Sequence, residues 1–188
     1  MPLPTVQDAK AYLRVDLPTE DPQFTLLLAR AKASIEGLLG YGITAAAVTF
    51  VAYGRRFSSN ELQLPGPFTA SPAPVVTDVD GVVVDSATYI LDSQAGKIRA
   101  KYDDYIFTSS QYTVVATIGL SAHPDYDARL EAVASSAILD LVAHFYENRF
   151  PGMSAEGGGG VSLAPDAIPV RIISDLMALP CTRGLLVA

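Results

Sequence analysis

Cysteine and histidine are almost absent from this 188-residue sequence, which contains one cysteine, Cys181, and two histidines. An intramolecular disulfide is therefore impossible, and a metal site built from several thiolates is excluded. His144 and Glu147 lie three residues apart, as some helix-borne ligands do, but no HExxH motif accompanies them. There is no Gly-x-Ser-x-Gly elbow and no evident base partner for Cys181, so the sequence predicts no catalytic residue and no metal.

Long apolar runs are also missing. Arg30 and Asp140 interrupt the two longest apolar segments, so neither reaches the roughly 18 residues that a membrane-spanning helix needs. The first residues lack the basic segment and apolar core of a signal peptide. The four glycines at residues 157–160 lack the lysine and Ser/Thr of a phosphate-binding loop. We therefore expect no membrane contact, no secretion by this route and no cofactor.

Charged residues are scarce, at 18% of the chain, while 49% of residues are hydrophobic. An ordinary soluble domain has about 25% charged residues. We expect the apolar faces of the helices to exceed what one copy can cover. Copies should then associate, because obligate interfaces resemble a domain core cut in half.

Basic residues are outnumbered, and the net charge is −7. The imbalance is concentrated between residues 58 and 127, where nine acidic residues face three basic ones. A protein that grips nucleic acid needs the opposite sign along its binding surface. This argues against tight DNA binding and leaves open a surface that DNA slides past.

The longest regular pattern runs from residue 125 to 149, where apolar residues at three- and four-residue steps predict one long α-helix. Asp125 is expected to cap it, and Pro151 and Gly152 to end it. Thr5 and Asp8 predict a capping box for a short first helix, and Asp21-Pro22 predicts the start of a second. The buried stripe of the long helix is expected to contain Leu130, Val133, Ala134, Ala137, Ile138, Leu141, Val142 and Phe145.

From Val48 to Leu120, short β-branched runs alternate with turn residues, which indicates a small antiparallel β-structure. Asp80-Gly81 predicts a tight hairpin, because its turn requires positive φ angles. The predicted strands are residues 48–57, 61–64, 74–79, 82–84, 89–91, 97–101 and 112–118.

Together these patterns predict an α+β protein. A helical bundle built on the long central helix (residues 1–47 and 121–150) carries an inserted small antiparallel β-domain (48–120). A glycine-rich linker (151–164) leads to a mobile C-terminal helix and tail (165–188), with the helix beginning near Pro169.

Three local patterns have two interpretations each. The segment Asp78-Val79-Asp80-Gly81 resembles part of a calcium loop but lacks the spacing and final glutamate, which favours a hairpin turn. Asp103-Asp104 fits a paired-carboxylate site or, the interpretation we favour, a solvated turn. Tyr146 and Arg149 suit an interface and suit ordinary helix-end packing equally well.

Several short motifs occur along the chain in an order that is informative when they are taken together. Residues 10–16 read KAYLRVD, and the middle of the chain contains LQLP at 62–65, VDG at 79–81 and YILD at 89–92. With the long helix ending in YENR, the glycine-rich gap and the proline-led final helix, this order resembles tailed-phage head–tail connector (adaptor) proteins. The resemblance is to the longer members with a β-rich insertion, which also occur in gene transfer agents. The C-terminus departs from the pattern, because only Arg183 precedes an apolar tail where members often carry a basic or aromatic cluster.

The resemblance implies a structural virion protein at the head–tail interface, made in the host cytoplasm. It implies a ring, usually a dodecamer, that joins the portal protein to a tail-side connector, stopper or tail terminator. DNA would pass through the ring without specific binding. Candidate contacts with the portal or a neighbouring copy are Tyr146, Arg149, Leu176, Met177, Leu185, Leu186 and Val187. Candidate residues of an acidic lumen or loop are Asp78, Asp80 and Asp85.

Two other classes stay open. A hydrolase would bring carboxylates together in a cleft with shifted pKa values. A small β-type module on a helical stalk, binding a glycan or a protein, would present aromatic side chains on one platform. The candidates for that platform are Tyr53, Tyr89, Tyr102, Tyr105 and Tyr112.

Overall fold

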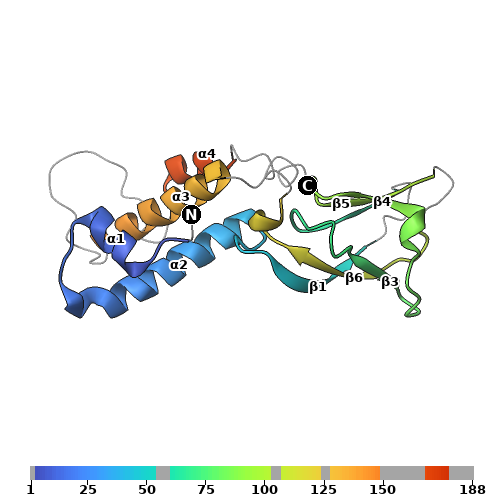
Figure 1. Ribbon diagram of the computed structural model, residues 1–188, viewed down its shortest axis with the longest axis horizontal. Helices are drawn as coiled ribbons and strands as arrows, with labels where there is room; N and C mark the ends of the chain where they lie inside the picture. Colours follow the sequence, from blue (N-terminus) through green and yellow to red (C-terminus); the bar gives the residue numbers. More distant parts are fainter. Residues whose placement is uncertain (1–2, 54–59, 103–106, 124–127, 149–167, 178–188) are drawn as a thin grey trace. The chain divides into compact units, whose positions relative to one another are not determined.

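The computed structural model describes residues 3–53, 60–102, 107–123, 128–148 and 168–177 (Figure 1). These residues form two compact units, a helical unit (3–39, 128–148 and 168–177) and a β unit (40–123, with the gaps just given). The predicted α+β class is confirmed. The predicted linker and the tail after residue 177 lie outside the described residues.

The helical unit contains α1 (Val6–Leu13), the 3-10 turn η1 (Pro18–Glu20), α2 (Asp21–Leu39), α3 (Ala128–Glu147) and α4 (Val170–Met177). The predicted capping box of α1 is confirmed: Thr5 N donates to Asp8 Oδ2 at 2.8 Å, and Asp8 N donates to Thr5 Oγ1 at 3.3 Å. Gly40 ends α2 with a φ of 78°, a conformation that glycine adopts without steric cost. The predicted cap and stop of the long helix, Asp125 and Pro151-Gly152, lie outside the described residues.

The core of the helical unit is formed by the apolar stripes of α2 and α3, which pack against each other. Each fully buried Leu, Ile or Phe contributes about 1.5–3 kcal/mol. Seven of the eight predicted α3 stripe residues are buried, and Val133 is partly exposed. The buried core residues of this unit are Ala9, Phe24, Ala31, Ile35, Leu39, Leu130, Ala134, Ala137, Ile138, Leu141, Val142, Phe145, Ile172 and Leu176.

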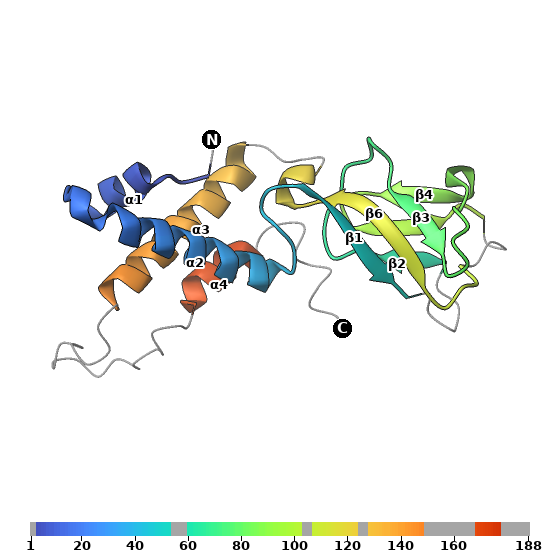
Figure 2. The ribbon, with the colours of Figure 1, turned by 90° about the horizontal axis from the view of Figure 1, so that it is seen from below.

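The β unit contains two three-stranded antiparallel sheets, which lie one above the other in Figure 1 and one in front of the other in Figure 2. Sheet A has the order β1 (Ala46–Ala52), β6 (Tyr112–Ile118) and β3 (Val75–Asp78). Sheet B has the order β2 (Glu61–Gln63), β5 (Lys97–Ala100) and β4 (Tyr89–Asp92). Two 3-10 turns, η2 (Ser86–Thr88) and η3 (Leu120–Ala122), complete the unit.

Alternation along the strands separates a buried face from an outer face in each sheet. β6 is the clearest case, because residues 112, 114, 116 and 118 are buried and the three between them are not. Sheet B contributes Leu62, Tyr89 and Ile98 to the buried side. The outer faces of the two sheets are therefore among the surfaces that this unit can offer to other molecules.

The predicted hairpin at Asp80-Gly81 is confirmed, with a φ of 82° at Gly81. Its second arm, residues 82–84, forms only an isolated bridge, Thr77 to Val83, and is not a full strand. The strand predicted at 48–57 begins earlier, at Ala46, because its register is set by β6, which lies far along the chain. Residues 54–57 lie outside the described residues.

Candidate interaction surfaces

The three predicted acidic residues lie at and just beyond the β3 hairpin, where two of them hold turns. Asp78 Oδ1 accepts hydrogen bonds from Asp80 N at 2.9 Å and Val82 N at 2.8 Å. Asp85 Oδ1 accepts from Ala87 N at 2.9 Å and caps η2. Asp80 is exposed at the tip of the turn. Asp78 and Asp85 therefore have a structural role in addition to their charge, and Asp80 is the residue that can be changed with least damage.

Tyr146 packs inside the helical unit. Its ring stacks on Phe24 with centroids 5.2 Å apart, and its hydroxyl donates to Glu20 Oε2 at 2.8 Å. One residue earlier, the Phe145 ring lies 4.1 Å from the Arg30 guanidinium carbon. These contacts pack the end of α3 against η1 and the first half of α2. Packing at the end of the helix therefore explains the position of the Tyr146 side chain. An additional contact with another subunit stays a prediction.

The other candidate contacts are placed only in part. Leu176 is fully buried, and it lies on α4, which packs against α3. In a single copy its side chain therefore offers no surface to a neighbour. The helix position of Met177 is described but not its side chain, and Arg149, Leu185, Leu186 and Val187 lie outside the described residues.

The aromatic platform expected of a β-type binding module is not formed by its described members. Tyr89 and Tyr112 are buried, with Tyr89 Oη donating to Pro74 O at 3.2 Å and Tyr112 Oη accepting from Ser109 N at 2.8 Å. Tyr53 and Tyr102 are exposed. This counts against the alternative of a β-type binding module, because alternation along β4 and β6 turns their tyrosines into the core. Tyr105 lies outside the described residues, as do Asp103 and Asp104.

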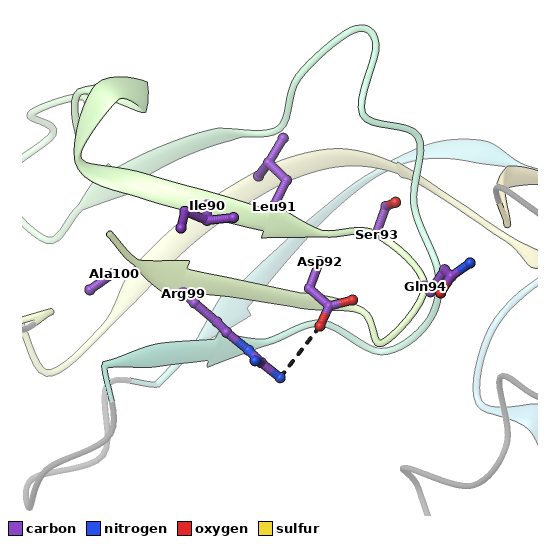
Figure 3. A pocket seen from close by; sticks show the side chains of 7 residues that line it. All are labelled: Ile90, Leu91, Asp92, Ser93, Gln94, Arg99 and Ala100. Atoms are coloured by element: carbon purple, nitrogen blue, oxygen red, sulfur yellow. Dashed lines mark ion pairs between the residues drawn. The ribbon is translucent and has the colours of Figure 1, made fainter. Parts of the chain in front are cut away.

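A groove of about 470 Å³ lies along β4 and β5 of sheet B (Figure 3). Arg99 and Asp92 point toward each other there, with Nη2 3.4 Å from Oδ2, and Arg99 Nε lies 3.6 Å from Glu61 Oε2. Lys97 Nζ is 3.0 Å from Glu61 Oε1. Both carboxylates are thus paired with cations, which suits an ion-pair network that braces the strands and does not suit hydrolysis by a proton-sharing pair. Among the described residues no group of three or more His, Cys, Asp or Glu could hold a metal.

The exposed apolar surface lies mainly on the β unit. Among the described residues, ten of the fourteen exposed large hydrophobic side chains belong to it. The helix stripes are only partly covered within the described helical unit, where Leu27, Leu28 and Leu38 of α2 stay partly exposed, so the expectation that the helix faces carry a surplus stays a prediction. The ten are Val48, Val51, Tyr53, Val75, Val79, Val82, Val83, Ile90, Tyr102 and Val115.

The outer face of sheet A is a continuous uncharged surface that motif analysis missed. Directly paired residues of antiparallel strands share a face, so the register defines its members. None of them carries a charge, whereas the outer face of sheet B carries the four charges of the ion-pair network. The Thr-Val-Thr alternation of β6 was the available signal. The members are Ala47, Thr49, Val51, Val75, Thr77, Val83, Thr113, Val115 and Thr117.

Among the described residues, no helix is both long enough and apolar enough to cross a membrane.

The sequence matches the family model of the head completion protein over residues 2–177. The chain belongs to the head completion protein family. Membership makes it a structural virion protein of a phage-type head–tail junction, which confirms the connector resemblance found in the sequence.

Solved structures share the fold of this head completion protein. A chain from the structure titled "Neck of empty GTA particle computed with C6 symmetry" is 22% identical, with a TM-score of 0.56. The match covers 90% of this chain and 88% of that one. A chain from "Virion of native gene transfer agent (GTA) particle" is 21% identical, with a TM-score of 0.56 and coverage of 91% of both chains. No curated protein matches the sequence.

Proposed function

We propose that this head completion protein closes into a ring, of twelve copies in the usual connector arrangement, between the portal protein and the tail-side connector or terminator. DNA passes through the centre of the ring without specific binding. The chain acts by binding its neighbours and not by catalysis. The observation that carries the proposal is the family match, which extends over almost the whole described chain.

Two properties of the molecule support a ring. The β unit exposes a row of uncharged Val and Thr side chains that a lone copy leaves in contact with water. The fold is also shared with chains of gene transfer agent particles, one of them from a neck determined with six-fold symmetry. Cyclic symmetry requires each copy to present two different patches, one to each neighbour.

The charge of the protein supports passage of DNA without capture. With a net charge of −7 and an exposed acidic turn at Asp80, the chain repels phosphate. We place Asp78, Asp80 and Asp85 toward the lumen, where repulsion would keep DNA moving during packaging and ejection.

The C-terminal segment is proposed as the contact with the portal. It includes Met177 and the apolar Leu185, Leu186 and Val187, which would supply apolar contacts on docking. Leu176 would join this contact only if α4 leaves α3, because its side chain is otherwise buried.

Reconstitution tests this function directly. DNA-filled heads made without the protein are incubated with purified protein and then with tails. We expect heads to retain their DNA and accept tails only after the protein is added. Heads that join tails equally well without it would contradict the proposal.

A further inference from the structure

We propose that sheet A continues from one copy to the next, with β1 of one copy lying beside residues 82–84 of its neighbour. The occupant of each exposed edge is therefore a second copy of this chain. This inference rests on the proposed ring and identifies the surface through which the ring closes.

The first edge is β1, which forms one border of sheet A. Among the described residues it pairs only with β6, so the N–H and C=O groups on its other side face away from the sheet. Its sequence, Ala-Ala-Val-Thr-Phe-Val-Ala, contains no charge and no proline. Proteins normally protect an exposed edge with lysine, proline or a bulge, because a bare edge recruits another strand. The absence of such protection indicates that this edge is used.

The second edge is the hairpin arm, residues 82–84, which lies beside β3 at the opposite border of sheet A. β1 and β3 lie on either side of β6 (Figure 2). Val82 O accepts from Asp78 N at 2.9 Å, and Val84 N donates to Val76 O at 2.9 Å. Backbone groups alternate in direction along a strand, so the N–H and C=O of Val83 point away from β3. The arm thus presents a short free edge made entirely of valine.

The two edges match in chemistry and in the face of the sheet to which their residues belong. Thr49 on β1 and Val83 on the arm belong to the same outer face of sheet A, and neither edge carries a charge. Because every copy has a net charge of −7, copies repel each other wherever charged surfaces meet. An uncharged edge with unpaired backbone groups is the contact that avoids this repulsion and gains hydrogen bonds.

The positions of the edges favour a ring over a closed pair. If β1 of one copy paired with β1 of another, the free backbone groups of both β1 edges would be paired, and assembly would stop at a dimer. An edge on one border that meets a different edge on the opposite border is a head-to-tail contact, which closes into a ring when the rotation between copies allows it.

Cross-linking distinguishes these arrangements. In a Cys181→Ser background, which removes the only cysteine, we compare Thr49→Cys, Val83→Cys and the double variant with a short bismaleimide. Within one chain the two positions are three strand spacings apart, roughly 14 Å, beyond the span of a short reagent. We expect a ladder of multimers from the double variant, dimers from a mixture of the two single variants, and no product from either single variant alone.

Each other result overturns the inference. Dimers from Thr49→Cys alone would mean that β1 edges meet each other. Absence of the ladder, in a preparation whose native mass shows rings, would place the ring contact elsewhere and leave the proposed function intact. If native mass shows no ring with or without the portal, the proposed function itself fails.

Discussion

Gly96 illustrates how one residue fixes the geometry of the β unit. It lies in the turn between β4 and β5 with a φ of 64°, and its carbonyl accepts from Leu64 N at 2.8 Å. A Cβ atom at this position would lie 2.7 Å from Gly66 O, a backbone atom that cannot move aside alone. Glycine is therefore required here by both backbone conformation and space.

We expect Gly96→Ala to lower the free energy of unfolding by about 1–3 kcal/mol, because strain and the backbone clash add. Urea titration followed by circular dichroism measures the change. Gly37→Ala is the matched control, since Gly37 lies in α2 with open space around it and alanine should stabilise the helix by about 0.5–1 kcal/mol. Equal effects of the two substitutions would contradict this assignment.

Tyr12 connects α1 to α3 through a pH-sensitive hydrogen bond. Its hydroxyl donates to the Asp140 carboxylate, and that bond raises the pKa of Tyr12 above its ordinary value of 10.0. The bond needs the protonated phenol, so its contribution is complete below pH 10 and is lost as the pH rises through the higher pKa of the folded state.

We therefore expect Tyr12→Phe to be slightly less stable than wild type at pH 8, by about 0.5 kcal/mol. The difference should shrink as the pH rises above 10, where wild type loses the bond as well. Denaturant midpoints at a series of pH values measure this, with the exposed Tyr53→Phe as the control. A gap that widens with pH would show that the sign is wrong.

At the scale of elements, the helices were predictable because their signals are local. The capping box at Thr5 and Asp8, the start at Asp21 and the stripe of α3 are each encoded within a few residues. Strand pairing was not predictable, since β1 pairs with β6 across sixty residues or more. The alternation of Thr and Val along β6 was a local signal for one exposed face, but the full uncharged face of sheet A could be defined only once that register was known.

The outer faces of the two sheets should respond differently to a charge. We expect Thr49→Lys, on the edge strand β1, to raise the concentration needed for assembly by about tenfold, because it places a charge in the uncharged contact. Ile90→Lys adds the same charge to the outer face of sheet B, which already carries charges, and should leave assembly unchanged. Analytical ultracentrifugation over a concentration series compares them. Loss of assembly in Ile90→Lys alone would assign the contact to the other sheet.

At the scale of the whole molecule, charge and apolar surface are divided between different tasks. Among the described residues, ten of the fourteen exposed large hydrophobic side chains lie on the β unit and four lie on the helical unit. The acidic excess favours solubility and repels DNA. The composition predicts that copies associate, which stays a prediction, and it could not assign the surface, because composition does not record which residues face each other.

We expect Asp80→Lys to slow DNA ejection if the β3 turn faces the lumen. Asp80 is chosen because the Asp78 and Asp85 carboxylates also hold turns. Asp16→Lys makes the same change of charge at an exposed position of the helical unit and serves as the control. Release of DNA from assembled particles is followed by fluorescence of an intercalating dye. Equal ejection rates for both variants and wild type would remove these residues from the lumen.

Native mass spectrometry of the purified chain, alone and bound to its portal, tests whether copies of this head completion protein close around an axis. We expect a discrete species whose mass is a single multiple of the chain, twelve copies in the usual connector arrangement. A strictly monomeric chain under both conditions would contradict it.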